Sequence, residues 1–216
     1  MKNTMKKLTA LSALLLLAAC GGNSVSKSDV QKAINKSVRN SSVCVPFQLN
    51  VEHLLPGEDP ALSQLGLPKV KLLKRLDDGK RANLKAIEQM DILADAGLYK
   101  QGKTERTGEG EHAVRHLVYE LTNEGMRKIR LSPQGPLLCI GNEHVKKVNY
   151  FTKPSPANGV TVTQVSYEAE IVPDRWAKKL LKEDARYDML KATKTQVATL
   201  VETNDGWRDI RDLSGY

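Results

Sequence analysis

The spacing of apolar and polar residues divides the chain into three regions. Residues 8–19 form an almost unbroken apolar run behind a basic start. From residue 28 onwards, apolar residues recur every three or four positions and predict helices over 29–39 and 81–96. Towards the C-terminus, stretches rich in Val, Thr, Tyr and Ile predict strands over 145–152, 160–172 and 195–203.

Capping and turn residues set the limits of the shorter elements in the first half. Ser28 and Gln31 fit a capping box at the start of the first helix. Gly97 is expected to end the second helix, because a glycine commonly follows the last helical turn. We then expect a strand over 116–121 and a short helix over 123–130.

The C-terminal strands are accompanied by one helix and one tight turn. Asp174 is expected to cap a helix over 175–183, in which Trp176 and Leu180 lie four residues apart. The run Asn204-Asp205-Gly206 is typical of a tight hairpin. This part of the chain therefore predicts an antiparallel sheet with the 175–183 helix laid across it.

A stretch in the middle of the chain resembles part of a winged-helix domain. The residues that carry the resemblance are LADAGL at 93–98 and YELTNEG at 119–125, separated by a polar loop. The resemblance covers about 81–130 and implies a helix followed by a hairpin wing. It says little about function, because this fold hosts many functions.

Together these patterns predict an α+β protein. A winged-helix-like N-terminal part is followed by an antiparallel sheet with a crossing helix. We expect the chain to divide into a signal peptide at 1–19, a tether at 20–27, a helical and winged-helix-like part at 28–141, and the sheet with its helix at 142–216.

The N-terminal apolar run has the form of an export signal. Lys2, Lys6 and Lys7 precede it without an acidic residue. The run is shorter than the roughly 20 apolar residues that span a bilayer, so a cleaved signal is expected instead of a membrane helix. The other interpretation of its end is an ordinary signal peptide with a chance cysteine.

The end of that run, Leu17-Ala18-Ala19-Cys20, resembles the lipobox of bacterial lipoproteins. The resemblance implies cleavage before Cys20 and attachment of acyl chains to it. Gly21, where an Asp would hold an enterobacterial lipoprotein in the inner membrane, implies the outer membrane facing the periplasm. We therefore expect a lipid-anchored protein of the cell envelope.

Two cysteines follow the anchor, Cys44 and Cys139. Exported proteins in an oxidising compartment rarely keep two free thiols, so a Cys44–Cys139 disulfide is expected. The wide separation does not match the Cys-x-x-Cys spacing of redox-active pairs, which favours a structural bond.

The net charge is moderately positive. The formal charge is +8, and loss of the three signal-peptide lysines leaves +5. A basic run in the middle of the chain could contact anionic lipid or an envelope polymer, or could be a solvated surface. Its members are Lys69, Lys71, Lys74, Arg75, Lys80, Arg81 and Lys85. Export to the envelope argues against nucleic acid as a partner.

No set of residues points to an enzyme, a metal or a cofactor. His112 and His116 lie four residues apart, but their spacing does not indicate a third metal ligand. Both are therefore expected to be surface histidines. The nucleophile motif Gly-x-Ser-x-Gly is absent. Asp77 and Asp78 are expected to be solvated residues of a turn.

Three functions remain open from the sequence. The first is a non-enzymatic binding or structural lipoprotein whose partner is another envelope protein or the membrane surface. The alternative is a periplasmic carrier of a small ligand or lipid, with a pocket between sheet and helix. Trp176 and Trp207 could line such a pocket, but aromatic packing in the core is the simpler expectation. An enzyme is the third, for which no residue set argues.

Overall fold

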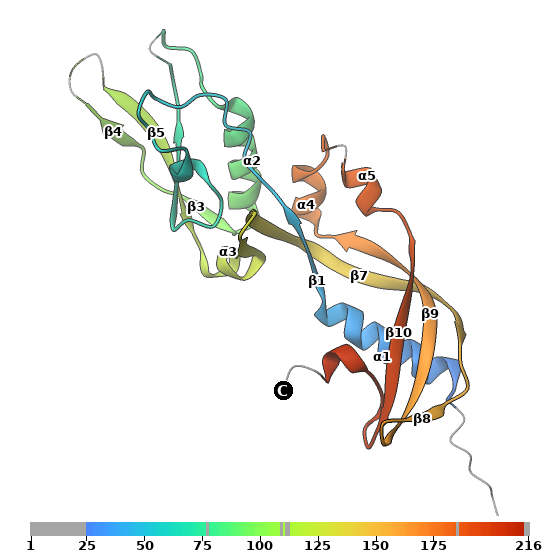
Figure 1. The fold of residues 1–216 in the computed structure, drawn as a ribbon. Helices are drawn as coiled ribbons and strands as arrows, with labels where there is room; N and C mark the ends of the chain where they lie inside the picture. Colours follow the sequence, from blue (N-terminus) through green and yellow to red (C-terminus); the bar gives the residue numbers. More distant parts are fainter. Residues whose placement is uncertain (1–24, 77, 109, 111–112, 185, 214–216) are drawn as a thin grey trace, which may run out of the picture.

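Two antiparallel sheets at opposite ends of an elongated molecule make up the fold (Figure 1). The structure is a computed structural model that describes residues 25–76, 78–108, 110, 113–184 and 186–213. A large lobe is built on a seven-stranded sheet and a small lobe on a four-stranded sheet.

The large sheet has the strand order β1-β7-β9-β10-β11, with all pairs antiparallel. Two short strands extend it, β6 beside β7 and β8 beside β9. The strands are β1 (Ser42–Pro46), β6 (Ile129–Ser132), β7 (Gly135–Phe151), β8 (Ser155–Ala157), β9 (Val160–Pro173), β10 (Lys194–Thr203) and β11 (Gly206–Asp209). The expected Asn204-Asp205-Gly206 hairpin joins β10 to β11, with Thr203 opposite Gly206.

Strand β7 links the two lobes. Its first half pairs with β1 and β6, and its second half pairs with β9. The boundary expected between 141 and 142 therefore falls inside one strand. At that point Gly141 approaches β9 so closely that a Cβ atom would lie 2.3 Å from the carbonyl oxygen of Val172. A side chain here would separate the two strands.

One helix, α1 (Lys27–Asn40), covers one face of the large sheet. Its apolar face, with Ile34 fully buried, packs on Val165, Tyr167 and Leu200. The helix expected over 29–39 is confirmed, but its N-cap is Ser26, not Ser28. Ser26 Oγ accepts a hydrogen bond from the backbone N–H of Asp29, and the Asp29 carboxylate accepts one from the N–H of Ser26. An acidic side chain in the first turn also suits the helix dipole.

An ion pair between a buried carboxylate and an exposed guanidinium closes the C-terminal edge of this lobe. Asp209, fully buried, accepts hydrogen bonds from the Arg211 guanidinium at 2.6 and 3.0 Å. Burial alone would raise the pKa of Asp209, but the hydrogen bonds from Arg211 outweigh it and hold that pKa below its usual value. These residues lead into the 3₁₀ helix η3 (Ile210–Asp212), where Asp212 accepts a hydrogen bond from Ser37 of α1.

The small lobe packs one helix against its sheet. Its strands are β2 (Lys69–Leu73), β3 (Tyr99–Gln101), β4 (Glu105–Thr107) and β5 (Val114–Leu121), and its helix is α2 (Leu84–Asp95). The Tyr119 hydroxyl donates a hydrogen bond to Asp91 of α2 at 2.8 Å. Burial, followed by the nearby Asp91, raises the pKa of Tyr119. Gly97, with a left-handed φ of 74°, follows the last turn of the helix, as expected.

The α+β prediction is confirmed in its coarse form, but the winged-helix interpretation of 81–130 is not supported. The local elements are present: α2, β3, the β4–β5 hairpin and α3 (Asn123–Lys128). However, α2 is preceded by strand β2, which pairs with β5, and not by the first helix of a helix-turn-helix. The segment after α3 continues directly into β6 of the large sheet.

The helix after β9 does not cross the large sheet as expected. It forms α4 (Arg175–Leu180), followed by α5 (Arg186–Leu190), and it packs beside α2. Ala177, Leu180 and Leu181 belong to the same core as α2 and the small sheet. The helix that covers the sheet is α1. Asp174 makes no side-chain cap and instead pairs with Lys128 at 2.8 Å.

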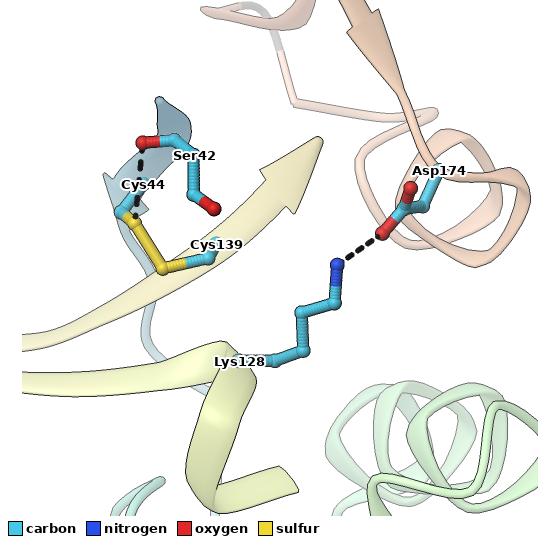
Figure 2. Close-up of a disulfide and its surroundings, with 5 residues drawn as sticks. All are labelled: Ser42, Cys44, Lys128, Cys139 and Asp174. Atoms are coloured by element: carbon cyan, nitrogen blue, oxygen red, sulfur yellow. Dashed lines mark hydrogen bonds and ion pairs between the residues drawn. A yellow bond between two sulfur atoms is a disulfide. The ribbon is translucent and has the colours of Figure 1, made fainter. Parts of the chain in front are cut away.

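The expected Cys44–Cys139 disulfide is confirmed. Cys44 of β1 lies directly opposite Cys139 of β7, next to the Lys128–Asp174 ion pair (Figure 2). Leu138 and Ile140, on either side of Cys139, are buried in the core of the small lobe. The disulfide and the Lys128–Asp174 ion pair therefore lie together where the two lobes join.

Replacing both cysteines should destabilise the protein strongly. Because the bond closes a loop across a sequence separation of 95 residues, Cys44→Ser/Cys139→Ser should lower the free energy of unfolding by about 4–5 kcal/mol. Urea unfolding followed by circular dichroism measures this. Reduced wild-type protein, as the control, should match the double variant; a loss below about 1 kcal/mol would contradict a structural role.

Candidate functional site

The segment 47–51 forms a ridge between two hollows at the lobe junction. Within the described part of the chain, no strand pairs with it beyond Pro46. Phe47 donates its backbone N–H to the carbonyl of Pro136 at 3.3 Å, and Asn50 donates its N–H to Gln89 of α2 at 2.9 Å. The ridge is thereby fixed to both lobes.

Asn83 fixes the chain that follows the ridge. Its side chain is 1% exposed, and Oδ1 accepts hydrogen bonds from the N–H groups of Glu52 and His53 at 2.9 and 2.8 Å. Its Nδ2 donates to the carbonyls of His53 and Leu73. Asn83 also has a φ of 52°, a left-handed conformation that Asn tolerates better than most residues. One side chain therefore connects this loop, β2 and the start of α2.

On one side of the ridge lies a polar cleft of about 440 Å³ between α2 and α4. Its floor contains Phe47, Ile92 and Leu180, and its rim carries both lysines and carboxylates. Lys85 of α2 lies 3.9 Å from Glu183 beyond α4, so the two walls attract each other across the opening. The remaining lining residues are Gln48, Asn50, Glu88, Gln89, Lys179, Lys182 and Asp184.

On the other side lies a more apolar groove of about 450 Å³. It runs along the loop that contains the 3₁₀ helix η1 (Pro60–Ser63). Leu54 in its wall is 38% exposed, and the neighbouring Leu62 is 39% exposed. The lining residues are Gln48, Leu49, Val51, Leu54, Pro60, Ala61, Ser63, Gln64 and Leu65.

Because Gln48 lines both hollows, we treat the polar cleft and the apolar groove as one junction surface. An apolar centre beside a charged rim is the usual composition of a protein–protein contact. A site for a small apolar ligand is instead an enclosed and mostly apolar cavity. The junction surface can therefore accommodate a polypeptide better than a lipid chain.

The basic run is divided among several places and is partly neutralised. Lys69 and Lys71 project from β2 towards Glu120 and Glu105, at 3.6 and 2.6 Å. The hydrogen bond from Lys71 holds the pKa of Glu105 below its usual value. These residues form a charge-balanced patch on the small sheet.

The rest of the basic run lies between β2 and α2 or on α2 itself. Lys80 pairs with Asp78 at 2.8 Å, and Arg75 donates to the carbonyl of Gly79. Arg75 also pairs through its backbone with Arg81, with Lys74 preceding them. Lys85 belongs to the cleft described above. The structure thus does not bring the seven residues into one basic face.

His116 is not a surface histidine, contrary to the sequence expectation. It is 5% exposed, and its Nε2 lies 2.9 Å from Oε1 of Glu58. The other Glu58 oxygen accepts the N–H of Leu55, so the pair holds the groove loop against β5. Within the described ranges, no three His, Cys, Asp or Glu side chains gather as metal ligands.

The tryptophans belong to two separate cores. Trp176 packs against the core of the small lobe and the junction, and Trp207 packs against the core beneath α1. Tyr167, fully buried in the second core, donates its hydroxyl to Gln196. Trp176 and Trp207 therefore do not line one common pocket.

Several expected features fall outside the described residues. They are Cys20 and its lipobox, His112, and Asp77. Of the helices that the structure describes, none combines the length and apolar character needed to cross a membrane. Comparisons with protein-family models, curated proteins and solved structures found no match.

Removing the Asn83 side chain should loosen the ridge. Asn83→Ala leaves two backbone N–H groups without partners and places Ala in a left-handed conformation, so the free energy of unfolding should fall by about 3–5 kcal/mol. Hydrogen exchange should accelerate at Glu52 and His53. Asn158→Ala is the matched control, because Asn158 is exposed and has a φ of 50°; its cost should be about 1 kcal/mol. An equal loss of unfolding free energy in the two variants would show that backbone strain alone, and not the lost hydrogen bonds, explains the effect of Asn83→Ala.

Proposed function

We propose that this chain is a lipid-anchored protein of the bacterial cell envelope that binds a partner protein through the junction surface. Acyl chains on Cys20 hold it on the outer membrane, facing the periplasm. Its role is binding or structural and not catalytic.

The anchor rests on the N-terminal sequence and gains support from the disulfide. Leu17-Ala18-Ala19-Cys20 follows a basic start and a short apolar run, as in a lipoprotein precursor. A single acyl chain binds membranes marginally, whereas two or more give a stable anchor. The Cys44–Cys139 bond joins adjacent strands and fits an oxidising compartment such as the periplasm.

Partner binding rests on one observation, the exposed apolar groove beside the charged cleft. Leu54 and Leu62 remain over one third exposed in a loop fixed by Asn83 and Glu58. A groove formed by a fixed loop can bind without first becoming ordered, which lowers the entropic cost of association. The mixed charges of Lys179, Lys182 and Glu183 could then select the partner.

Cys20→Ser should abolish lipidation. Mass spectrometry of the wild-type protein purified from membranes should find an N-terminal peptide that begins at Cys20 and carries acyl chains. The variant should contain no acylated peptide and incorporate no labelled palmitate. Cys44→Ser/Cys139→Ser is the control, because it removes the two disulfide-bonded cysteines but should keep the acyl label. An unmodified thiol at Cys20 in the wild type would refute the anchor.

Photo-reactive residues should locate the partner. When placed at Leu54 or Leu62 in living cells, they should give one discrete cross-linked protein product, because both positions border the groove. Val160 is the matched control, since it is 44% exposed and pairs with Ala157 of β8. Strand β8 lies at the end of the large sheet away from the small lobe (Figure 1). Absence of products at the groove positions, or the same products at Val160, would contradict partner binding by the junction surface.

A further inference from the structure

The outer face of α1 carries a basic stripe that the proposed function does not use. Lys32, Lys36 and Arg39 are exposed on the side of the helix opposite the buried Ile34. Together with Asn35 they surround a shallow hollow of about 280 Å³. Their spacing of four and three residues places them in one row along the helix.

The side chains of this α1 basic stripe form no close ion pairs with the described residues. None of its three side chains forms an ion pair with any residue in the described part of the chain. Asp29, three residues before Lys32, feels its positive charge, but the Asp29 carboxylate is hydrogen-bonded by Ser26 in the N-terminal cap. The basic run on the small lobe differs, because Lys69, Lys71 and Lys80 each face a carboxylate.

The position of the stripe along the chain brings it close to the proposed anchor. Ser26, the N-cap of α1, follows Cys20 by six residues. A fully extended chain of that length spans about 20 Å, and α1 itself is about 20 Å long. If Cys20 is acylated, the stripe therefore lies within about 40 Å of the bilayer surface and can reach it.

We infer that the α1 basic stripe binds the headgroups of anionic phospholipids in the membrane that holds the acyl chains. This inference rests on the proposed lipid anchor. Each Lys or Arg held near an anionic leaflet strengthens binding about fivefold. Electrostatic attraction decays within about 8 Å at physiological salt, so the stripe must approach the surface closely. The large lobe then lies against the membrane through α1, and the junction surface faces away from it.

The test uses the mature lipidated protein in vesicles of phosphatidylcholine, with or without phosphatidylglycerol. A fluorophore on a cysteine introduced at Asn35, between the basic residues, reports quenching by a headgroup-attached nitroxide. Quenching should increase severalfold when phosphatidylglycerol is present and decrease when salt is added. A fluorophore at Leu131, which is 75% exposed on β6, should remain weakly quenched in both vesicles.

Charge-reversal variants test whether Lys32, Lys36 and Arg39 cause the phosphatidylglycerol-dependent quenching. Lys32→Glu/Lys36→Glu/Arg39→Glu should lose the phosphatidylglycerol-dependent quenching at position 35. Lys74→Glu/Lys103→Glu/Arg130→Glu changes the net charge equally at exposed positions elsewhere and should retain it. Both proteins should still float with the vesicles, because acyl chains hold them. Flotation without preferential quenching at position 35 would overturn the stripe alone, whereas failure to float in high salt would overturn the anchor.

Discussion

The pairing of β1 with the first half of β7 is the constraint on which the rest of the structure depends. The Cys44–Cys139 bond joins these strands covalently, and the residues on either side of Cys139 are buried in the core of the small lobe. The second half of β7 contributes Val145 and Val148 to the core beneath α1. One continuous strand therefore belongs to both cores, so the lobes cannot separate without breaking its hydrogen bonds.

This rigid connection gives the two lobes different roles. Helix α1 leads directly into β1, so the end of the chain nearest the proposed anchor is fixed to the large sheet. The chain leaves β1 at the junction and forms the ridge with its cleft and groove. A lipid anchor at one end and a contact surface at the junction would position a partner at a fixed distance from the membrane.

The sequence predicted the elements with strong local patterns. The α1 helix, α2 with its Gly97 end, the β10–β11 hairpin and the disulfide follow from periodicity, turn chemistry and cysteine number. The strand at 135–144 was missed, because a short apolar run such as 137–140 fits a buried helix or a strand equally well. The winged-helix interpretation was wrong because a strand, β2, precedes α2. Strand β2 pairs with β5, more than forty residues later in the chain, and local sequence patterns do not reveal such a pairing.

The candidate site was less accessible from the sequence. Asn83 contacts a loop thirty residues earlier, and no local pattern marks such a contact. The sequence pointed first to the dense basic run, yet carboxylates neutralise part of its charge in the structure. The sparser row at 32, 36 and 39 is readable from helical periodicity, but its unpaired state required the structure. The number of basic residues in a stretch of sequence is thus a weaker guide to a binding surface than the acidic side chains that lie near them in the structure.

In the proposed orientation, the protein rests on its α1 face and the junction surface is directed away from the bilayer. Energy transfer from donors at Asn35 and at Leu62 to an acceptor dye in the supporting bilayer measures both heights in the lipidated protein. Energy transfer should be strong from Asn35 and weak from Leu62. Equal transfer from the two positions, or stronger transfer from Leu62, would contradict the proposed orientation.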